Sequence, residues 1–169
     1  ANVRRALGRA RVAAGATAAT RFEPGQDLEA LADTLRRAHR KPLNLVVHGT
    51  GLPPLAVERG DMLELLGNLL DNGWRWAASR IAVTAARTAD GRFVRLSVED
   101  DGAGIPPDAR VAALAAGQRL DERGDGHGFG LSIANELATL YGGTLMLESA
   151  ALGGLAAIVT LPTSPSCDV

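Results

Sequence analysis

Two asparagines spaced by four residues are the first side chains in this sequence that could do chemistry. Asn68 and Asn72 lie in ELLGNLLDNGWRW, residues 64–76, whose apolar spacing predicts a helix, and residues at i and i+4 project from one helical face. Amide oxygen is a hard, neutral ligand suited to Mg²⁺, which usually keeps waters and substrate phosphates as its other ligands. A solvated polar face that binds nothing is the alternative, and the pair alone leaves both open.

A carboxylate at the end of a predicted strand is the second candidate. In RFVRLSVEDDGAGIP, residues 92–106, Val98 and Asp100 share one strand face, so Asp100 continues a buried apolar row. A buried carboxylate is costly unless it is hydrogen-bonded, and at a pocket floor it could accept a hydrogen bond from the amino group of adenine. Gly102 and Gly104 would let the backbone approach a flat ligand. A plain Asp-Gly turn is the alternative, whereas calcium-loop and dinucleotide-binding spacings are not met.

A glycine-rich stretch is the third candidate. GDGHGFGL, residues 124–131, has glycines at alternate positions immediately before a predicted helix. Free N–H groups and the dipole at a helix N-terminus make an anion site. No Lys-Ser or Lys-Thr pair follows, so this is not a Walker loop, and a flexible linker is the alternative. The long segment from residue 105 to 126 is predicted to be a lid over a nucleotide.

The elements that must position these residues follow from periodicity and turn signals. Helices are predicted over residues 1–15, 27–40 (capped by Asp27), 61–79 and 131–143. Strands are predicted within 20–24 and over 43–49, 80–87, 92–100, 144–149 and 155–162. Asp90-Gly91 is the strongest hairpin signal. Strands in mostly hairpin-like succession with three helices among them predict an α+β fold, a two-layer α/β sandwich with helices on one face.

The bulk properties exclude several classes of function. The chain has 169 residues and a formal net charge of −1, which is the size of one ordinary domain without the basic surplus of a nucleic-acid-binding protein. It contains no run of about 20 apolar residues that would predict a membrane span. The single cysteine, Cys167, allows no internal disulfide and favours a reducing compartment. Because the first residue is not methionine, we expect a piece of a longer protein.

Taken in order, the three stretches resemble the ATP-binding domain of sensor histidine kinases, within the superfamily of gyrase, Hsp90 and mismatch-repair ATPases. ELLGNLLDNGWRW resembles the N box, DDGAGI the first glycine box and GHGFGL the second. The resemblance covers roughly residues 18–162, and GQRLD before the second box is most similar to the PhoQ-type branch. It implies the Bergerat fold: a mixed, largely antiparallel sheet, three helices on one face and a long ATP lid.

The resemblance also implies a site for ATP and Mg²⁺. Asn72, Asn68 and Gln118 would hold the metal, and Asp100 would receive the adenine amino group. Phosphoryl positioning is implied for Asn68, Arg75 and Arg110, with no certain catalytic residue. The residues implied to bind ATP are Asn68, Asn72, Arg75, Trp76, Asp100, Gly102, Gly104, Ile105, Arg110, Gln118, Gly126, His127, Gly128, Phe129, Gly130 and Leu131.

The type of residue at position 68 bears on the reaction. ATP-hydrolysing relatives carry a glutamate there that activates water, and an amide cannot act as that base. The resemblance therefore implies transfer of the phosphoryl group by positioning and charge neutralisation. Arg75 replaces the usual lysine, Gly73 replaces an alanine, and Leu114 stands about where the lid phenylalanine would be. A nucleotide-dependent interaction (pseudokinase) domain and a hydrolysing ATPase remain the alternatives.

The family pattern predicts how the longer protein is organised. Residues 1–16 would be the end of a dimerisation helix, 17–162 the catalytic domain and 163–169 a disordered tail. We expect the phosphoacceptor histidine outside this chain, because His39 lacks an acidic neighbour in the sequence and lies inside the ATP domain. Expected partners are the dimerisation and phosphoacceptor domain of the same kinase and a response regulator, with no nucleic acid or membrane contact. The full-length protein would be a homodimer whose catalytic domain is cytoplasmic, attached to an inner-membrane sensor.

Overall fold

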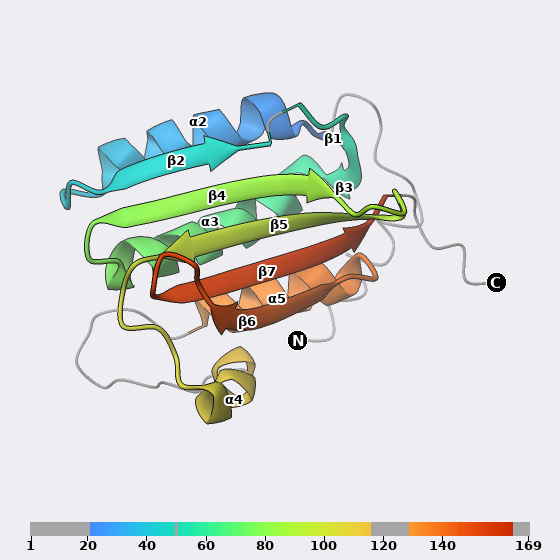
Figure 1. Cartoon of the computed structure of the whole chain (residues 1–169). Coiled ribbons are helices and arrows are strands. Elements are labelled where there is room, and N and C mark those ends of the chain that lie inside the picture. Colours follow the sequence, from blue (N-terminus) through green and yellow to red (C-terminus); the bar gives the residue numbers. More distant parts are fainter. Residues whose placement is uncertain (1–20, 50, 116–128, 164–169) are drawn as a thin grey trace.

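A mixed sheet of five strands in the order β2-β4-β5-β7-β6 carries the domain (Figure 1). The structure is a computed structural model that describes residues 21–49, 51–115 and 129–163. The strands are β2 (Asn44–His48), β4 (Arg80–Arg87), β5 (Phe93–Asp100), β6 (Thr144–Ser149) and β7 (Leu155–Pro162). Only β2 and β4 pair in parallel among these strands, and the other neighbours are antiparallel. This is the mixed, largely antiparallel sheet that the resemblance implies.

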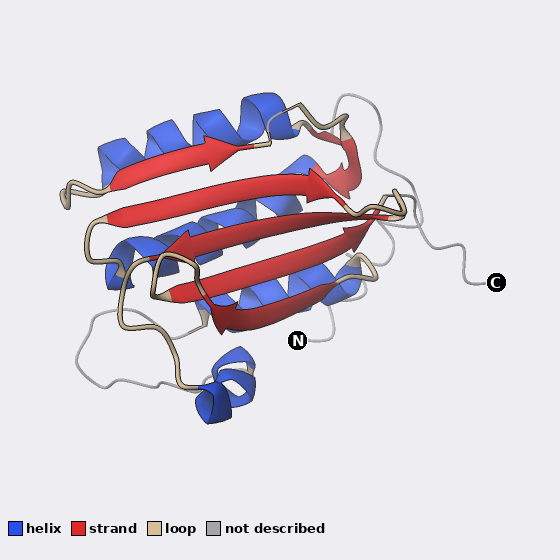
Figure 2. Cartoon of the chain, viewed as in Figure 1, coloured by secondary structure: helices blue, strands red, loops and turns tan. Residues whose placement is uncertain are grey.

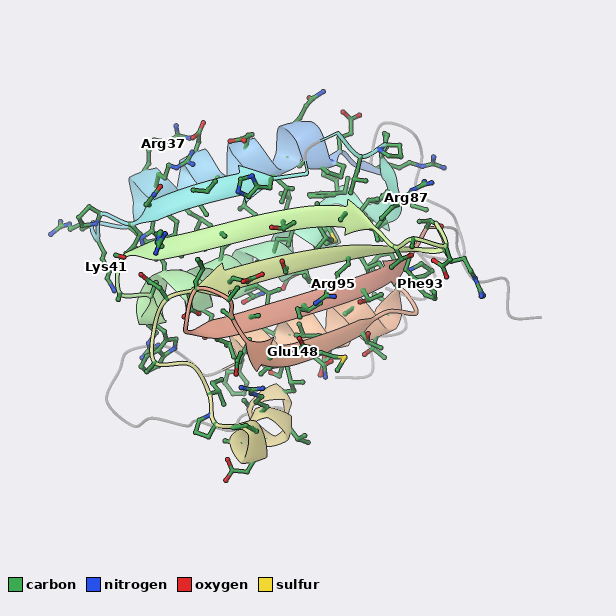
Figure 3. All side chains as sticks on the ribbon, viewed as in Figure 1. Arg37, Lys41, Arg87, Phe93, Arg95 and Glu148 are labelled. Atoms are coloured by element: carbon green, nitrogen blue, oxygen red, sulfur yellow. The ribbon has the colours of Figure 1, made fainter. Side chains whose placement is uncertain are left out.

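Three helices cover one face of the sheet, as predicted (Figures 1 and 2). They are α2 (Pro24–Ala38), α3 (Arg59–Trp76) and α5 (Gly130–Leu140). The alternation of β5 explains the choice of face, since Val94, Leu96 and Val98 are all buried and point to the same side of the strand. Arg95 on β5 and Glu148 on β6 lie on the other face, which these helices leave uncovered (Figure 3).

The central helix, α3, sits over the middle of the sheet because one side of it is almost entirely apolar. Gly73 on this side lies against β4 and β5, where an added Cβ atom would be 3.5 Å from Ile81 Cδ1 and 3.7 Å from a Val98 methyl group. The buried residues of the helix are Met62, Leu65, Leu66, Leu69, Leu70, Gly73 and Trp74. The predicted asparagine face is thereby directed away from the sheet, beside α5.

The start of α2 differs from the prediction that Asp27 caps it. The helix begins at Pro24 after Glu23, and Asp27 lies inside the helix, buried at 4% exposure. Its Oδ2 accepts a hydrogen bond from the Glu23 backbone N–H at 2.8 Å, and its Oδ1 pairs with Arg59 Nε at 2.7 Å. Asp27 therefore satisfies the N–H of the capping residue from within the helix, as the reverse half of a capping box does, but from one residue further along the chain.

Two further elements were not predicted from the sequence. The strand β3 (Leu55–Glu58) pairs with β1 (Arg21–Phe22) in a small antiparallel sheet, and the turn-rich prolines before β3 concealed its short alternation. After β5, a 3₁₀ turn at Pro107–Ala109 leads into the short helix α4 (Arg110–Leu114), which lies below β6 in the view of Figure 1.

Several expectations fall outside the described residues. These are the dimerisation-helix remnant at residues 1–16, the second half of the predicted lid and, apart from Thr163, the predicted tail. Within the described ranges, no helix is both long enough and apolar enough to cross a bilayer. The predicted hairpin at Asp90-Gly91 is present, with β4 and β5 antiparallel and Gly91 at φ +69°. It sets the register that places Asp100 opposite Ile81.

Candidate functional site

The carboxylate of Asp100 ends β5 and is 3% exposed. Its Oδ1 accepts hydrogen bonds from the backbone N–H groups of Gly102 at 2.8 Å and Leu155 at 3.2 Å. Its Oδ2 accepts none from any described residue. Burial raises the pKa of the Asp100 carboxyl, and the two N–H donors oppose that rise. One oxygen is thus held by the protein, while the other retains its full capacity to accept a hydrogen bond.

Two glycines let the backbone close around this carboxylate. A Cβ atom on Gly154, in the turn between β6 and β7, would lie 2.2 Å from Asp100 Oδ1, so only glycine fits there. A Cβ atom on Gly102 would lie 2.3 Å from the carbonyl oxygen of Trp76. Gly102 therefore brings the end of β5 against the C-terminal end of α3. Gly104 also lies here, next to the Gly154 carbonyl.

The two asparagines lie on the polar side of α3, each partly buried. Asn68 Nδ2 donates to the Glu64 carbonyl at 2.7 Å, which directs Oδ1 away from the helix. That oxygen lies 3.4 Å from where a Cβ atom of Gly130 would be, so the first residue of α5 is its neighbour. The side chain of Asn72 makes no hydrogen bond to a described residue. Both amide oxygens are therefore available as ligands.

The C-terminal turn of α3 carries a cation and an aromatic ring. The Arg75 guanidinium carbon lies 5.4 Å from the centroid of the Trp76 ring, a cation–π distance. Trp76 is 46% exposed, and its carbonyl touches Gly102. Asn68 lies eight residues earlier in the helix, about 12 Å along its axis at 1.5 Å per residue. The helix therefore links its C-terminal end, beside Asp100, to its middle, where Asn68 lies beside the start of α5.

Ile105 and Arg110 lie at the Asp100 end of this arrangement. Ile105 packs against the hydrophobic core. The Arg110 guanidinium donates from Nε to the Ile105 carbonyl at 2.9 Å and from Nη2 to Ser149 Oγ at 2.8 Å. It makes no hydrogen bond to the asparagine face of α3 within the described residues. The structure therefore does not bring Arg110 together with Asn68.

Only the end of the second glycine box is described. Gln118, Gly126, His127 and Gly128, which the resemblance assigns to ATP or metal, lie outside the described residues. Phe129 precedes α5 and is 46% exposed; its carbonyl accepts hydrogen bonds from the hydroxyl of Ser132 and the N–H of Ile133, both at 2.9 Å. Leu131 packs on the core.

His39, which was not expected to be the phosphoacceptor, holds α2 against α3. Its ring stacks on Trp74 with centroids 5.1 Å apart, and its Nε2 lies 2.9 Å from an Asp71 carboxylate oxygen. The Trp74 indole N–H donates to the Lys41 carbonyl at 3.1 Å, and Lys41 Nζ donates to the carbonyl of Ala77. These contacts fix the lateral position of the helix that carries the asparagines.

Sequence reasoning missed the residues that support Asp100 from the far hairpin. Gly154 donates its N–H to the Asp100 carbonyl at 3.1 Å, and Leu155 donates to its side chain across a separation of 55 residues. The Gly153-Gly154 pair signals a turn but says nothing of its partner. No group of three or more His, Cys, Asp or Glu side chains able to hold a metal occurs in the described ranges.

Comparison with known proteins gives the family. A family model described as histidine kinase-, DNA gyrase B- and HSP90-like ATPase matches residues 58–165. This chain belongs to that family. The match begins with the last residue of β3 and contains α3, Asp100 and the second glycine box, so all three motifs lie inside it.

Sensor kinases are among the relatives in sequence. The sensor protein kinase CarS of Pseudomonas aeruginosa is 46% identical over 165 residues, covering 96% of this chain and 36% of that protein. The two-component sensor PhoQ of the same organism is 39% identical over 128 residues, covering 75% and 28%. The chain thus spans about a third of the length of these relatives. It is an ATP-binding catalytic domain of the sensor histidine kinase type, as the motifs predicted.

Solved structures agree on the fold. The nucleotide-free catalytic domain of the histidine kinase ThkA superposes with a TM-score of 0.75 at 21% identity, covering 86% of this chain and 96% of that one. Full-length ShkA, solved in complex with AMPPNP, gives a TM-score of 0.73 at 27% identity, covering 97% of this chain and 36% of that one. The predicted two-layer α/β sandwich is confirmed.

Proposed function

We propose that this domain binds Mg-ATP across the end of β5 and the polar side of α3, and presents the γ-phosphoryl group to a histidine on a dimerisation domain outside the chain. One observation carries the proposal. Asp100 is buried, the backbone satisfies one of its oxygens, and its other oxygen has no hydrogen-bond partner among the described residues. Solvent reaches that oxygen, because no fully buried side-chain oxygen or nitrogen among the described residues lacks a hydrogen-bond partner. An adenine amino group would donate to it in place of water.

The base would be held between Asp100 and the end of α3. Gly102 and Gly104 let the backbone pack closely beside the carboxylate, where a Cβ atom would meet the Trp76 or the Gly154 carbonyl, and Ile105 offers an apolar surface. Trp76 is exposed enough to lie against a flat ring. An adenine amino group donates hydrogen bonds, so an acceptor at Asp100 favours adenine over a base that presents only a carbonyl there.

The phosphates and metal would lie along the asparagine face toward α5. Asn72 and Asn68 would give Mg²⁺ neutral oxygen ligands, with Gln118 as a further proposed ligand, while phosphates supply the negative charge. Gly130 and Leu131 begin α5, whose N–H groups and dipole favour an anion. Bound Mg-ATP would supply the phosphoryl group that is transferred. Arg75 would neutralise the charge of the phosphoryl group after moving away from the Trp76 ring. Arg110 could reach the phosphoryl group only after breaking its hydrogen bond to Ser149.

Transfer is favoured over hydrolysis by the chemistry of α3. The residue whose oxygen faces α5 is Asn68, and an amide cannot take a proton from water. Catalysis by this chain would therefore consist of orienting the nucleotide and neutralising charge. The relatives are sensor kinases, which supports a dimerisation and phosphoacceptor domain in the same protein, a response regulator as partner, a homodimer, and a cytoplasmic catalytic domain at residues 17–162.

Two measurements test the proposal. Calorimetric titration with ADP and with a non-hydrolysable ATP analogue should show binding that tightens with Mg²⁺. Adding labelled ATP and a separately produced dimerisation domain should then transfer label to that domain and not to this chain. Binding without transfer would establish a nucleotide-dependent interaction domain. Release of phosphate without an acceptor would establish a hydrolysing ATPase, and absence of binding would overturn the proposal.

A further inference from the structure

Asp101, the residue after the proposed base-binding carboxylate, is bound entirely to a different part of the chain. Its Oδ1 accepts hydrogen bonds from the N–H groups of Ala78, Ser79 and Arg80 at 2.9, 2.9 and 3.0 Å. Its Oδ2 accepts from the Ser79 N–H at 3.1 Å and from the Ser79 hydroxyl at 2.6 Å. Ala78 and Ser79 lie in the turn that joins α3 to β4, and Arg80 is the first residue of β4.

This attachment lies beside a second contact between the same two segments. Gly102 packs on the Trp76 carbonyl with no room for a Cβ atom, and the Asp101 N–H donates to the Arg80 carbonyl at 3.3 Å. Hydrogen bonds from Ser79 and Arg80 hold the pKa of Asp101 well below its usual range, so the acceptor stays ionised at any pH at which the domain would work. The Asp101 side chain and the backbone of Asp101 and Gly102 therefore hold the end of β5 against the end of α3 and the residues that follow it.

The side chains of Asp100 and Asp101 point in different directions and make different contacts. The Asp100 side chain is buried in the sandwich and uses one oxygen. Asp101 follows the last residue of β5, and its hydrogen bonds direct both of its oxygens toward residues 78–80. The end of α3 carries Arg75 and Trp76, and its relation to Asp100 sets the geometry of the proposed nucleotide site. The Asp101 hydrogen bonds are side-chain contacts that hold the residues just after α3 next to the end of β5.

We propose that Asp101 is a positioning residue for nucleotide binding, which holds Trp76 and Arg75 in register with Asp100 without touching the nucleotide. The inference rests on the proposed function of Asp100. The competing interpretation is a turn cap that contributes only to stability. Cap loss lowers the melting temperature but leaves the affinity of the folded protein intact, whereas loss of register weakens nucleotide binding in protein that remains folded.

The test uses substitutions that remove or preserve the acceptor. Asp101→Ala removes every hydrogen bond that the carboxylate accepts. It should weaken ADP binding by about tenfold or more while circular dichroism shows folded protein. Asp101→Asn keeps one oxygen for the three N–H donors and gains an NH₂ group that can donate to Ser79 Oγ. It should restore the affinity to within about threefold of the unmodified chain. The matched control is Asp90→Ala, which removes a turn acceptor for Thr88 Oγ and the Arg92 N–H at the other end of the same hairpin, and should lower stability without changing affinity.

The outcomes separate the two proposals. If the unmodified chain binds no ADP, the proposed function fails and takes this inference with it. If the unmodified chain binds and Asp101→Ala binds equally well, Asp101 is only a cap and the inference is overturned. Should Asp101→Ala not fold, Ser79→Ala, which removes only the 2.6 Å hydroxyl bond, should weaken ADP binding by about twofold to fourfold and shift the Trp76 indole N–H resonance of the nucleotide-free domain. If Ser79→Ala shows neither change, the inference is likewise overturned.

Discussion

Asp100→Asn separates the function of the buried carboxylate from its structural contacts. Asparagine keeps an oxygen at the position of Oδ1, so the bonds from Gly102 and Leu155 at 2.8 and 3.2 Å can be retained. The amide NH₂ then occupies the position of Oδ2, where it presents a donor to the amino group of adenine. The substitution therefore removes the proposed base contact while it preserves the shape of the site.

Asp100→Asn should weaken ADP binding strongly without lowering the melting temperature. A hydrogen bond to a charged group contributes about 1.5–3 kcal/mol, which corresponds to roughly 10- to 150-fold in the dissociation constant of ADP. Burial raises the pKa of Asp100 in the folded protein, so the folded state disfavours the ionised form at neutral pH. Removing the ionisable group should therefore leave the melting temperature unchanged or raise it.

The same shift predicts opposite responses of stability and binding to acid. The pKa of Asp100 in the folded protein lies above the value of about 3.9 in the unfolded chain. As pH falls, the carboxyl is therefore protonated at a higher pH in the folded protein than in the unfolded chain. Wild-type stability from this group should rise as pH falls from neutral through the raised folded pKa, and is fully present below the unfolded pKa. Affinity for ADP should fall as Asp100 protonates. Asp100→Asn should show neither dependence.

Calorimetric titration with ADP and thermal unfolding on the same samples measure both effects. Glu99→Gln is the matched control, since it neutralises the preceding residue, which is only partly buried on the opposite face of β5, and it should bind ADP normally. The reasoning is refuted if Asp100→Asn binds ADP as tightly as the unmodified chain. It is also refuted if Glu99→Gln weakens binding to the same extent, because the effect would then be one of charge alone.

Three other substitutions probe the frame of the site. Gly154→Ala places a Cβ atom 2.2 Å from Asp100 Oδ1 and should reduce both urea stability and ADP binding; normal ADP binding would show that the turn is free to shift. Gly67→Ala adds a Cβ atom that has no atom of the described residues within 4 Å apart from the adjoining helix backbone. It should stabilise α3 by about 1 kcal/mol in urea unfolding with ADP affinity unchanged, and destabilisation would contradict the packing. Tyr141→Phe removes a 2.6 Å bond to Asp61 and should cost about 1–2 kcal/mol. Because burial and then this bond raise the pKa of Tyr141, wild-type stability should fall as pH rises above about 10, the unfolded value, and Tyr141→Phe should lack that loss.

The sequence predicted the features that depend on local periodicity and on motif order. The 3.6-residue repeat of α3 separates Asn68 and Asn72 from the buried leucines, and the structure has the same two sides. The Asp90-Gly91 turn set the hairpin that delivers Asp100 to the end of β5. The family match then confirmed what three ordered motifs had indicated. The first two of these signals lie close in the sequence to the feature that each predicts.

Long-range support could not be predicted from the sequence. The bonds of Asp100 to Leu155 depend on the register of β5 with β7, and that register is set by the whole sheet. The misplaced start of α2 has a similar cause. Asp27 is a common capping residue type, but its carboxylate is buried in a pair with Arg59 from the next helix, and tertiary contact overrode the local preference.

The glycines show why residue type alone does not reveal which positions of a motif carry function. Gly73 is an unusual residue for the last turn of α3, yet a Cβ atom there would make ordinary contacts of 3.5 Å with Ile81, so packing does not require it. Gly102 and Gly154 look like plain turn residues, yet any Cβ atom would collide with Trp76 or Asp100 at 2.3 and 2.2 Å. These two allow the ends of α3, β5 and the β6–β7 turn to meet around one carboxylate. The constraint on the proposed site therefore lies in backbone approach as much as in the side chains that would contact ATP, which is why substitutions at Gly154 and Asp101 should test it as severely as substitutions at Asp100.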